Sequence, residues 1–191
     1  MTLKIRVFDT ILEKKRGDSA TRNSSDFWRP FCSASCWEFN YERVHSLRDI
    51  ELFFSKHIKE EIIIFSGHGT DTDGFHLSNG EKIDGTQDFK KVAKNAGKTL
   101  IFSSCLIGSN LNRAVAIKQA FAASTLFAYQ HVMEDRFCFL NEAILLTMLG
   151  HNLEKNRKKF SENDFIDFVV NTEFMKNMNQ KGVKNHPLLM F

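Results

Sequence analysis

The sequence predicts a single α/β domain, a three-layer sandwich with a mostly parallel sheet between helices. Three short and almost unbroken apolar runs, at 61–65, 99–102 and 125–129, are rich in β-branched and aromatic residues, as central parallel strands are. Segments with helical spacing separate these runs, and this alternation indicates βα crossovers. The length of 191 residues suits one domain, so we expect a single domain over residues 1–191.

Further strands and loops complete the expected sheet. Two strands are predicted upstream, at 3–8 and at 36–44, where aromatic and polar residues alternate. Residues 10–34 interrupt the pattern with polar clusters, so we expect a polar loop insertion there. A short hairpin is predicted over 74–84, turning at Asn79-Gly80.

Four segments show helical spacing. Ser46 followed by Asp49 resembles a capping box that opens the first, and Ser161 opens the last. A long helix is expected to end at Gly150. The apolar stripes that predict the four helices are Leu47, Ile50, Phe54 and His57; Phe89, Val92, Ala93 and Ala96; Phe137, Leu140, Ile144 and Met148; and Phe165, Phe168 and Val169.

Composition and charge exclude several classes of protein. Hydrophobic residues make up 42% of the chain and charged residues 26%, with only 2 Pro, as in an ordinary globular protein rather than a disordered one. A net charge of +3 is too mild to indicate nucleic acid as a partner. No apolar run approaches the roughly 18 residues of a membrane span. Charged residues among the first ten interrupt any secretory signal, so we expect a cytoplasmic protein without a membrane partner.

The four cysteines are expected to be thiols, because no export signal points to an oxidising compartment. Cys32 and Cys36 form a C-x3-C pair that lacks the second pair of a zinc site. We therefore expect no metal and no cofactor.

Reactive side chains follow two of the central runs. The first run leads into Ser66-Gly67-His68-Gly69 and the second into Ser103-Ser104-Cys105. Ligands of open parallel sheets bind at the carboxyl ends of the strands, so His68 and Cys105 would be neighbours if their strands are adjacent. This is a Cys-His hydrolase arrangement.

The chemistry of such a pair is nucleophilic. A thiol with a pKa near about 8.5 becomes a better nucleophile when an imidazole takes its proton, and His68 would be that base. The backbone amides of Gly69 and Cys105 are candidates for stabilising the oxyanion. Two alternatives stay open: Cys105 as a buried structural thiol, and His76 as the base, a residue of a substrate loop or a surface histidine.

The same residues carry a resemblance to the caspase-like cysteine peptidases of clan CD, and most of all to their bacterial CHAT-type and separase-like branch. The residues that resemble it are the strand before Ser66-Gly67-His68-Gly69, the segment Gly74–Leu77 with Gly80, and Leu100–Cys105. Downstream, Gln130–Phe137, a long helix and the closing Asn185–Leu189 are also similar. The resemblance covers residues 61–191, and the first 60 match only in coarse pattern.

The resemblance implies an endopeptidase with His68 as catalytic histidine, Cys105 as nucleophile, and the amides of Gly69 and Cys105 at the oxyanion. In members of the family that cut after Arg or Lys, an acidic side chain near the loop after the next strand lines the first specificity pocket, which points here to Asp135 or Glu134. The same two acids also fit the first turn of a helix, where the dipole favours negative charge.

The implied partners are a protein or peptide substrate and an activating protein, in a bacterial defence or regulated-cell-death role. Ala128-Tyr129 stand where the family often has glycine, so the shape of the pocket departs from its pattern. Two other functions remain: a catalytically silent interaction domain of the same fold, and a cysteine hydrolase acting on small molecules.

Overall fold

A six-stranded sheet forms the centre of the molecule, with strand order β2-β1-β3-β7-β8-β9. The computed structural model describes residues 2–10, 23–154, 160–174 and 185–191. All neighbouring strands are parallel except β8 and β9, so the predicted mostly parallel sheet is confirmed. The strands are β1 (Lys4–Asp9), β2 (Glu38–Arg43), β3 (Ile62–Ser66), β7 (Thr99–Ser103), β8 (Thr125–Tyr129) and β9 (Leu188–Met190).

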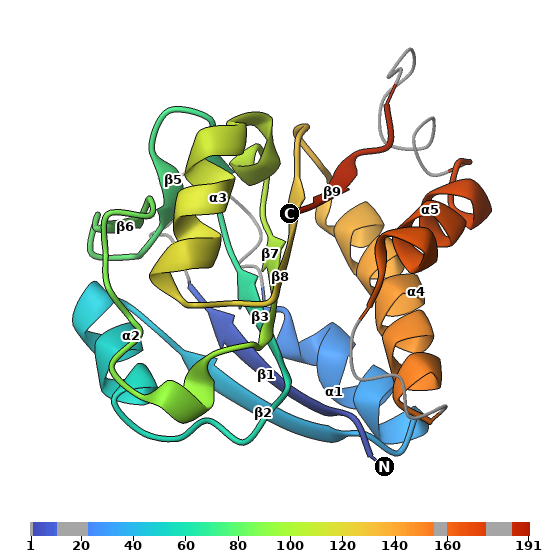
Figure 1. Ribbon diagram of the computed structural model, residues 1–191, viewed down its shortest axis with the longest axis horizontal. Helices are drawn as coiled ribbons and strands as arrows, with labels where there is room; N and C mark the ends of the chain where they lie inside the picture. Colours follow the sequence, from blue (N-terminus) through green and yellow to red (C-terminus); the bar gives the residue numbers. More distant parts are fainter. Residues whose placement is uncertain (1, 11–22, 155–159, 175–184) are drawn as a thin grey trace.

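Helices cover both faces of this sheet, as Figure 1 shows. One face carries α1 (Ser25–Ala34), α4 (Asp135–Glu154) and α5 (Glu162–Asn171), and the other carries α2 (Leu47–Phe54) and α3 (Leu111–Ala120). Alternate residues of each strand enter the two cores: Ile62 and Ile64 of β3 belong to the core on the side of α1, α4 and α5, and Ile63 and Phe65 to the core on the opposite side. Burial on both faces explains why the central strands are apolar without interruption.

A second, smaller sheet follows β3. It consists of β4 (Gly69–Thr70), β5 (Gly74–His76) and β6 (Lys82–Ile83), all antiparallel. Gly80 lies in the turn between β5 and β6 with a φ of +88°, a conformation that favours glycine. The predicted hairpin is confirmed, and the sheet stands directly beyond the carboxyl end of β3.

Residues 10–34 were expected to form a loop, and this expectation was wrong for the second half of the segment. Residues 25–34 form α1, while 11–22 lie outside the described residues. The helix forms because Trp28 and Cys32, four residues apart, are both 0% exposed in the core. The polar residues around them hid this apolar stripe in the sequence.

The prediction of a helix after Thr86 was also wrong. Only a single 3-10 turn forms there, η1 (Ala93–Asn95). Phe89 stacks on Phe121 with ring centroids 4.3 Å apart, and its amide donates to the carbonyl of Ala120 at 2.9 Å. These contacts with the end of α3 hold the segment in an irregular path.

The predicted capping box at Ser46 is confirmed for α2, and α5 begins after Ser161 as predicted, where Ser161 and Asp164 also form a capping box. The long helix was predicted to end at Gly150, and this was wrong: α4 passes through Gly150 and continues to Glu154. A β-carbon at Gly150 would lie 2.9 Å from the ring of Trp37, so the glycine serves close packing rather than termination. Leu140, expected on the buried stripe, is 45% exposed, whereas Leu145 and Leu146 are buried.

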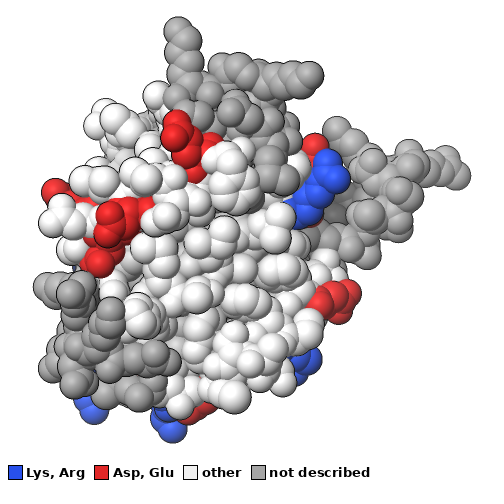
Figure 2. Space-filling model, turned by 90° about the vertical axis from the view of Figure 1, so that its right-hand side faces the viewer, with Lys and Arg blue, Asp and Glu red and all other residues white. Residues whose placement is uncertain are grey.

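Three large apolar side chains are exposed on and just after α5. Ile166, Val170 and the following Phe174 are exposed at intervals of four residues. Figure 2, which views the molecule from this side, shows that uncharged side chains cover most of the described surface. In the described part of the chain, no helix has both the length and the hydropathy needed to cross a membrane.

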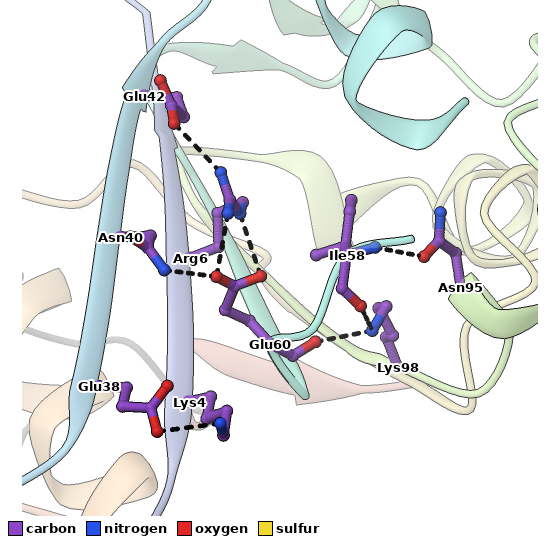
Figure 3. A network of polar contacts seen from close by, with 9 residues as sticks. All are labelled: Lys4, Arg6, Glu38, Asn40, Glu42, Ile58, Glu60, Asn95 and Lys98. Carbon is purple, nitrogen blue, oxygen red and sulfur yellow. Dashed lines mark hydrogen bonds and ion pairs between the residues drawn. The ribbon is translucent and has the colours of Figure 1, made fainter. Parts of the chain in front are cut away.

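A network of ion pairs and hydrogen bonds links β1 and β2 to the segments that precede β3 and β7, at the amino-terminal edge of these central strands (Figure 3). The guanidinium of Arg6 donates to both carboxylate oxygens of Glu60, at 3.2 and 2.9 Å, and the amide of Asn40 donates to one of them. The ammonium of Lys98 donates to the carbonyls of Ile58 and Glu60, each at 2.7 Å. This network lies at the sheet edge opposite the ends that carry His68 and Cys105.

Candidate active site

The structure brings the two predicted catalytic residues to one edge of the sheet. β3 and β7 are adjacent and parallel, and Ser66 pairs with Ser103 in the register. His68 and Cys105 each follow two residues beyond that pair. The amide of Gly67 donates to the carbonyl of Ser103 at 3.3 Å, so the two segments stay side by side past the last ladder pair.

The glycines on either side of His68 permit close contact with neighbouring backbone and side chains. A β-carbon at Gly69 would lie 2.5 Å from the carbonyl oxygen of Cys105 and 2.7 Å from the side chain of Ile107. A β-carbon at Gly67 would lie 2.4 Å from the methyl group of Thr10. A larger residue at 69 would therefore push the histidine segment away from the cysteine segment, and one at 67 would clash with Thr10.

Cys105 is partly exposed, and its sulfur is held by the loop after β8. The amide of Met133 donates to the sulfur at 3.2 Å, and the thiol lies 3.5 Å from the carbonyl oxygen of Met133. Leu106 has a φ of +61°, which bends the chain sharply away from the sulfur, and its amide donates to the carbonyl of His131. Left-handed backbone at a residue that is not glycine costs energy and often occurs at functional sites.

A comparison with Cys32 shows how this environment differs from that of a structural thiol. Cys32 is completely buried, and burial raises the pKa of its thiol to about 11. Cys105 is neither fully buried nor part of the core, although it packs against one side of it. Cys105 therefore does not have the full burial expected of a structural thiol.

The two histidines have different surroundings. His68 is exposed, and its carbonyl accepts from the amide of His76 at 2.9 Å, which fixes its backbone to the small sheet. His76 is half-buried on β5, with its Nε2 3.3 Å from the hydroxyl of Thr70. His68 is thus the histidine in register with Cys105, while His76 contacts its own hairpin.

Glu134 and Asp135 lie at the start of α4. Both side chains are exposed, and Glu134 forms an ion pair with Arg136 at 2.8 Å. They directly follow Met133, whose backbone contacts the sulfur of Cys105. This position is close along the chain to the residue that contacts Cys105, and it is also that of first-turn acids favoured by a helix dipole.

Sequence reasoning missed Asp9 as a residue of this edge. Asp9 ends β1, pairs with Ser66 in the register, and is 0% exposed. Its Oδ2 accepts from the amide and hydroxyl of Ser24 and from the hydroxyl of Tyr41, at 2.9–3.0 Å. Its Oδ1 has no hydrogen-bond partner among the described residues. The signal was available, because Asp9 follows an apolar strand as His68 and Cys105 do.

Other polar groups gather around the same ends of the strands. The buried hydroxyls of Ser66 and Ser104 also lack a hydrogen-bond partner in the described part of the chain. A separate open hollow is lined by Asp71, Ser109, Asn110, Leu111 and Asn112. Within the described ranges, no group of three or more His, Cys, Asp or Glu side chains is arranged to hold a metal ion.

Two solved structures show the same fold. No protein-family model and no curated protein matches the sequence. The complex of the pro- and mature domains of RgpB from Porphyromonas gingivalis aligns with a TM-score of 0.53 and 10% identity, over 97% of this chain and 46% of that one. The Drosophila initiator caspase Dronc aligns with a TM-score of 0.55 and 9% identity, over 98% of this chain and 78% of that one.

These neighbours are clan CD caspase-like proteins, and the chain has their mixed α/β architecture. The chain spans less than half the length of the RgpB complex chain with which it aligns. At about a tenth identity the likeness concerns the fold, so the roles of individual residues rest on the geometry of this chain.

Proposed function

We propose that this protein is a cysteine endopeptidase that uses His68 and Cys105 as its catalytic dyad. The observation that carries the proposal is the register of β3 and β7, because it sets the two residues equally far beyond adjacent strand ends. The caspase-like fold, a fold of cysteine peptidases, supports the same class. The partly exposed sulfur, oriented by Met133, supplies an accessible nucleophile.

The reaction proceeds through an acyl enzyme. His68 accepts the thiol proton, and the sulfur of Cys105 attacks the carbonyl carbon of the scissile peptide bond. The amides of Gly69 and Cys105 donate hydrogen bonds to the oxyanion. The C–N bond then breaks as His68 returns the proton to the leaving amine. A water molecule, deprotonated by His68, hydrolyses the thioester and restores the thiol.

We propose that the enzyme cleaves its substrate after a basic residue, Arg or Lys. Asp135 and Glu134 are the surface acids nearest along the chain to the loop that holds the sulfur. Asp9 is a third candidate, since it is a buried carboxylate on the same sheet edge whose Oδ1 has no hydrogen-bond partner among the described residues. A carboxylate of this kind would favour the charged end of Arg or Lys.

The biological setting is proposed from the sequence resemblance alone. A relation to the bacterial CHAT-type and separase-like branch, a cytoplasmic location, a dedicated protein substrate and an activating partner all belong to this proposal. A role in defence or regulated cell death follows from the same resemblance.

The test is cleavage of a mixed peptide library, analysed by mass spectrometry, with wild type, Cys105→Ala and His68→Ala. Cys36→Ala is the matched control, because it removes an exposed thiol far along the chain from the site. We expect cuts with wild type and Cys36→Ala and none with Cys105→Ala. Cuts after Arg or Lys that disappear in Asp9→Asn, Asp135→Asn or Glu134→Gln would assign the pocket; cuts after other residues would overturn the basic specificity.

The two alternative functions give different results in the same experiment. A small-molecule cysteine hydrolase would cleave simple thiol-reactive esters but leave the peptides intact. A silent interaction domain would cleave neither, and Cys105→Ala would retain the affinity of wild type for its partner. Cleavage that persists in Cys105→Ala would overturn the proposed nucleophile.

A further inference from the structure

One side chain joins the segment that carries His68 to the helix that follows Cys105. The guanidinium of Arg113 donates from Nη1 to the carbonyl of Asp71 and from Nη2 to the carbonyl of Thr72, the latter at 2.5 Å. Asp71 and Thr72 lie three and four residues beyond His68. A planar guanidinium suits this task, because its donors can bind two consecutive carbonyls in one fixed orientation.

The Arg113 backbone is itself fixed relative to Cys105. Arg113 is in the first turn of α3, and its amide donates to the side chain of Asn110, the N-cap of that helix, at 3.1 Å. Leu106 and the short turn η2 (Ile107–Ser109) separate Cys105 from this cap. The guanidinium therefore starts from a rigid base on the cysteine side of the site.

The histidine segment is equally well defined where Arg113 reaches it. The hydroxyl of Thr70 accepts from the amide of Asp73 at 3.0 Å, which closes a tight turn around Asp71 and Thr72. On the strand side, the segment is held by the bond from Gly67 to Ser103 and by the close approach of Gly69 to Cys105. His68 thus lies between a strand-side attachment and the attachment supplied by Arg113.

We propose that Arg113 is a positioning residue for the dyad, setting the distance between His68 and Cys105 without touching the substrate. This inference rests on the proposed function. Proton transfer between an imidazole and a thiol needs the two groups within hydrogen-bond reach, so a displacement of about 1 Å lowers the rate strongly. Loss of the guanidinium would release the turn at Asp71 and let the histidine drift from the sulfur.

The experiment measures the alkylation of Cys105 by iodoacetamide as a function of pH, so it needs no knowledge of the substrate. The thiolate displaces iodide and forms a carbamidomethyl thioether, and peptide mass spectrometry reports the modified residue. The variants are Arg113→Ala, Arg113→Lys and His68→Ala. Lys82→Gln is the matched control, because the Lys82–Asp73 ion pair of 2.5 Å stabilises the same hairpin without reaching α3.

We expect the rate for Arg113→Ala near neutral pH to fall about tenfold, toward that of His68→Ala, and to converge with wild type at alkaline pH, where the thiol ionises unaided. Arg113→Lys should recover part of the loss, since an ammonium can bind one carbonyl at a time. Lys82→Gln should react like wild type. The thermal unfolding midpoint of Arg113→Ala should stay close to that of wild type, because the contact is at the surface.

The possible failures are distinguishable. If His68→Ala reacts as fast as wild type at neutral pH, the dyad itself is wrong, and the proposed function falls with the inference. If His68→Ala is slow but Arg113→Ala reacts like wild type, the dyad stands and the positioning role is overturned. An equal loss of rate in Lys82→Gln, or a loss in Arg113→Ala matched by a large drop in unfolding midpoint, would show a general structural role and also overturn it.

Discussion

At the scale of single residues, the site depends on one very close approach between two backbone segments. Gly69 leaves no room for a side chain next to the carbonyl of Cys105 and the side chain of Ile107. The neighbouring atoms include backbone, which cannot rotate away as a flexible side chain can. The identity of residue 69 therefore controls the distance between the two loops that carry the dyad.

We expect Gly69→Ala to separate these loops. Overpacking of this kind typically costs about 1–3 kcal/mol, and here the strain falls on the backbone of Cys105. The measurement is the rate of Cys105 alkylation at neutral pH together with unfolding in urea, and we expect a reduced rate with a modest loss of stability. Gly80→Ala is the control: it has open space around it but a positive φ, so it should lose about 1 kcal/mol and keep its rate. Normal reactivity in Gly69→Ala would contradict this account of the site.

The sequence pointed to His68 and Cys105 as candidates because both lie just beyond apolar strands. Asp9 obeys the same rule, but the polar residues after it made it look like the start of a loop. The contact of Met133 with the sulfur could not be predicted, because it joins residues 28 apart across the loop after β8. Local pattern locates strand ends, but it does not show which loops fold back over them.

At the scale of elements, the segment between β6 and β7 shows how tertiary contacts override helical spacing. Asn95, in the single 3-10 turn of this segment, is buried. Its side chain accepts from the amide of Ile58 at 2.8 Å and donates to the carbonyls of Phe54 and Lys56. These three bonds satisfy backbone groups at the end of α2 and in the irregular segment that follows it.

We expect Asn95→Ala to lower the free energy of unfolding by about 2–3 kcal/mol, because it leaves buried backbone groups without partners. Urea denaturation measures the loss. Asn95→Asp is the informative comparison, since it keeps an acceptor for the Ile58 amide but removes both donors and places a charge in the core. A loss below about 0.5 kcal/mol in Asn95→Ala would mean that water replaces the amide without cost.

Helix beginnings were easier to predict than helix ends. The capping boxes at Ser46 and Ser161 are local signals made by residues three apart, and both formed. Gly150 looked like a helix end but is used for contact with Trp37, which precedes β2. A glycine has two physical uses, and only the packing of distant elements shows which one applies.

At the scale of the whole molecule, the ion-pair network and the proposed dyad lie at opposite edges of the sheet. The network around Glu60 lies where β3 and β7 begin, and His68 and Cys105 lie where they end. Burial raises the pKa of Glu60, but the hydrogen bonds from Arg6 and Asn40 and the charge of Arg6 outweigh it and hold the pKa below its ordinary value of 4.5. For Lys98, burial lowers the pKa.

The depressed pKa of Glu60 links folding to pH. Below pH 4.5 the unfolded chain takes up a proton on this carboxylate before the folded protein does. The stabilisation is therefore fully present above pH 4.5 and is lost as pH falls through the folded-state pKa. Acid should weaken the amino-terminal edge of the sheet through this group.

We expect Glu60→Gln to unfold about 2–3 kcal/mol more easily than wild type at neutral pH, because Arg6 loses its buried partner. The difference should shrink as pH falls below 4.5, since wild type then loses the same charge. Urea denaturation from pH 7 to acid measures this. Alkylation of Cys105 under native conditions should be unchanged, because the network lies at the opposite edge. A difference that is constant with pH would contradict the linkage.

The sequence by itself determined the class of the fold, the central strands, the hairpin after β3 and the two helix caps, because these depend on local hydrophobic period and local hydrogen bonds. It also pointed to His68 and Cys105, since both follow buried strands. Only the tertiary structure decided the order of strands, the helical state of residues 25–34, the irregular path before β7 and the contacts of Met133 and Arg113 around the site. Each of these depends on residues far apart in the chain, whose contacts become favourable only when the whole sheet has assembled.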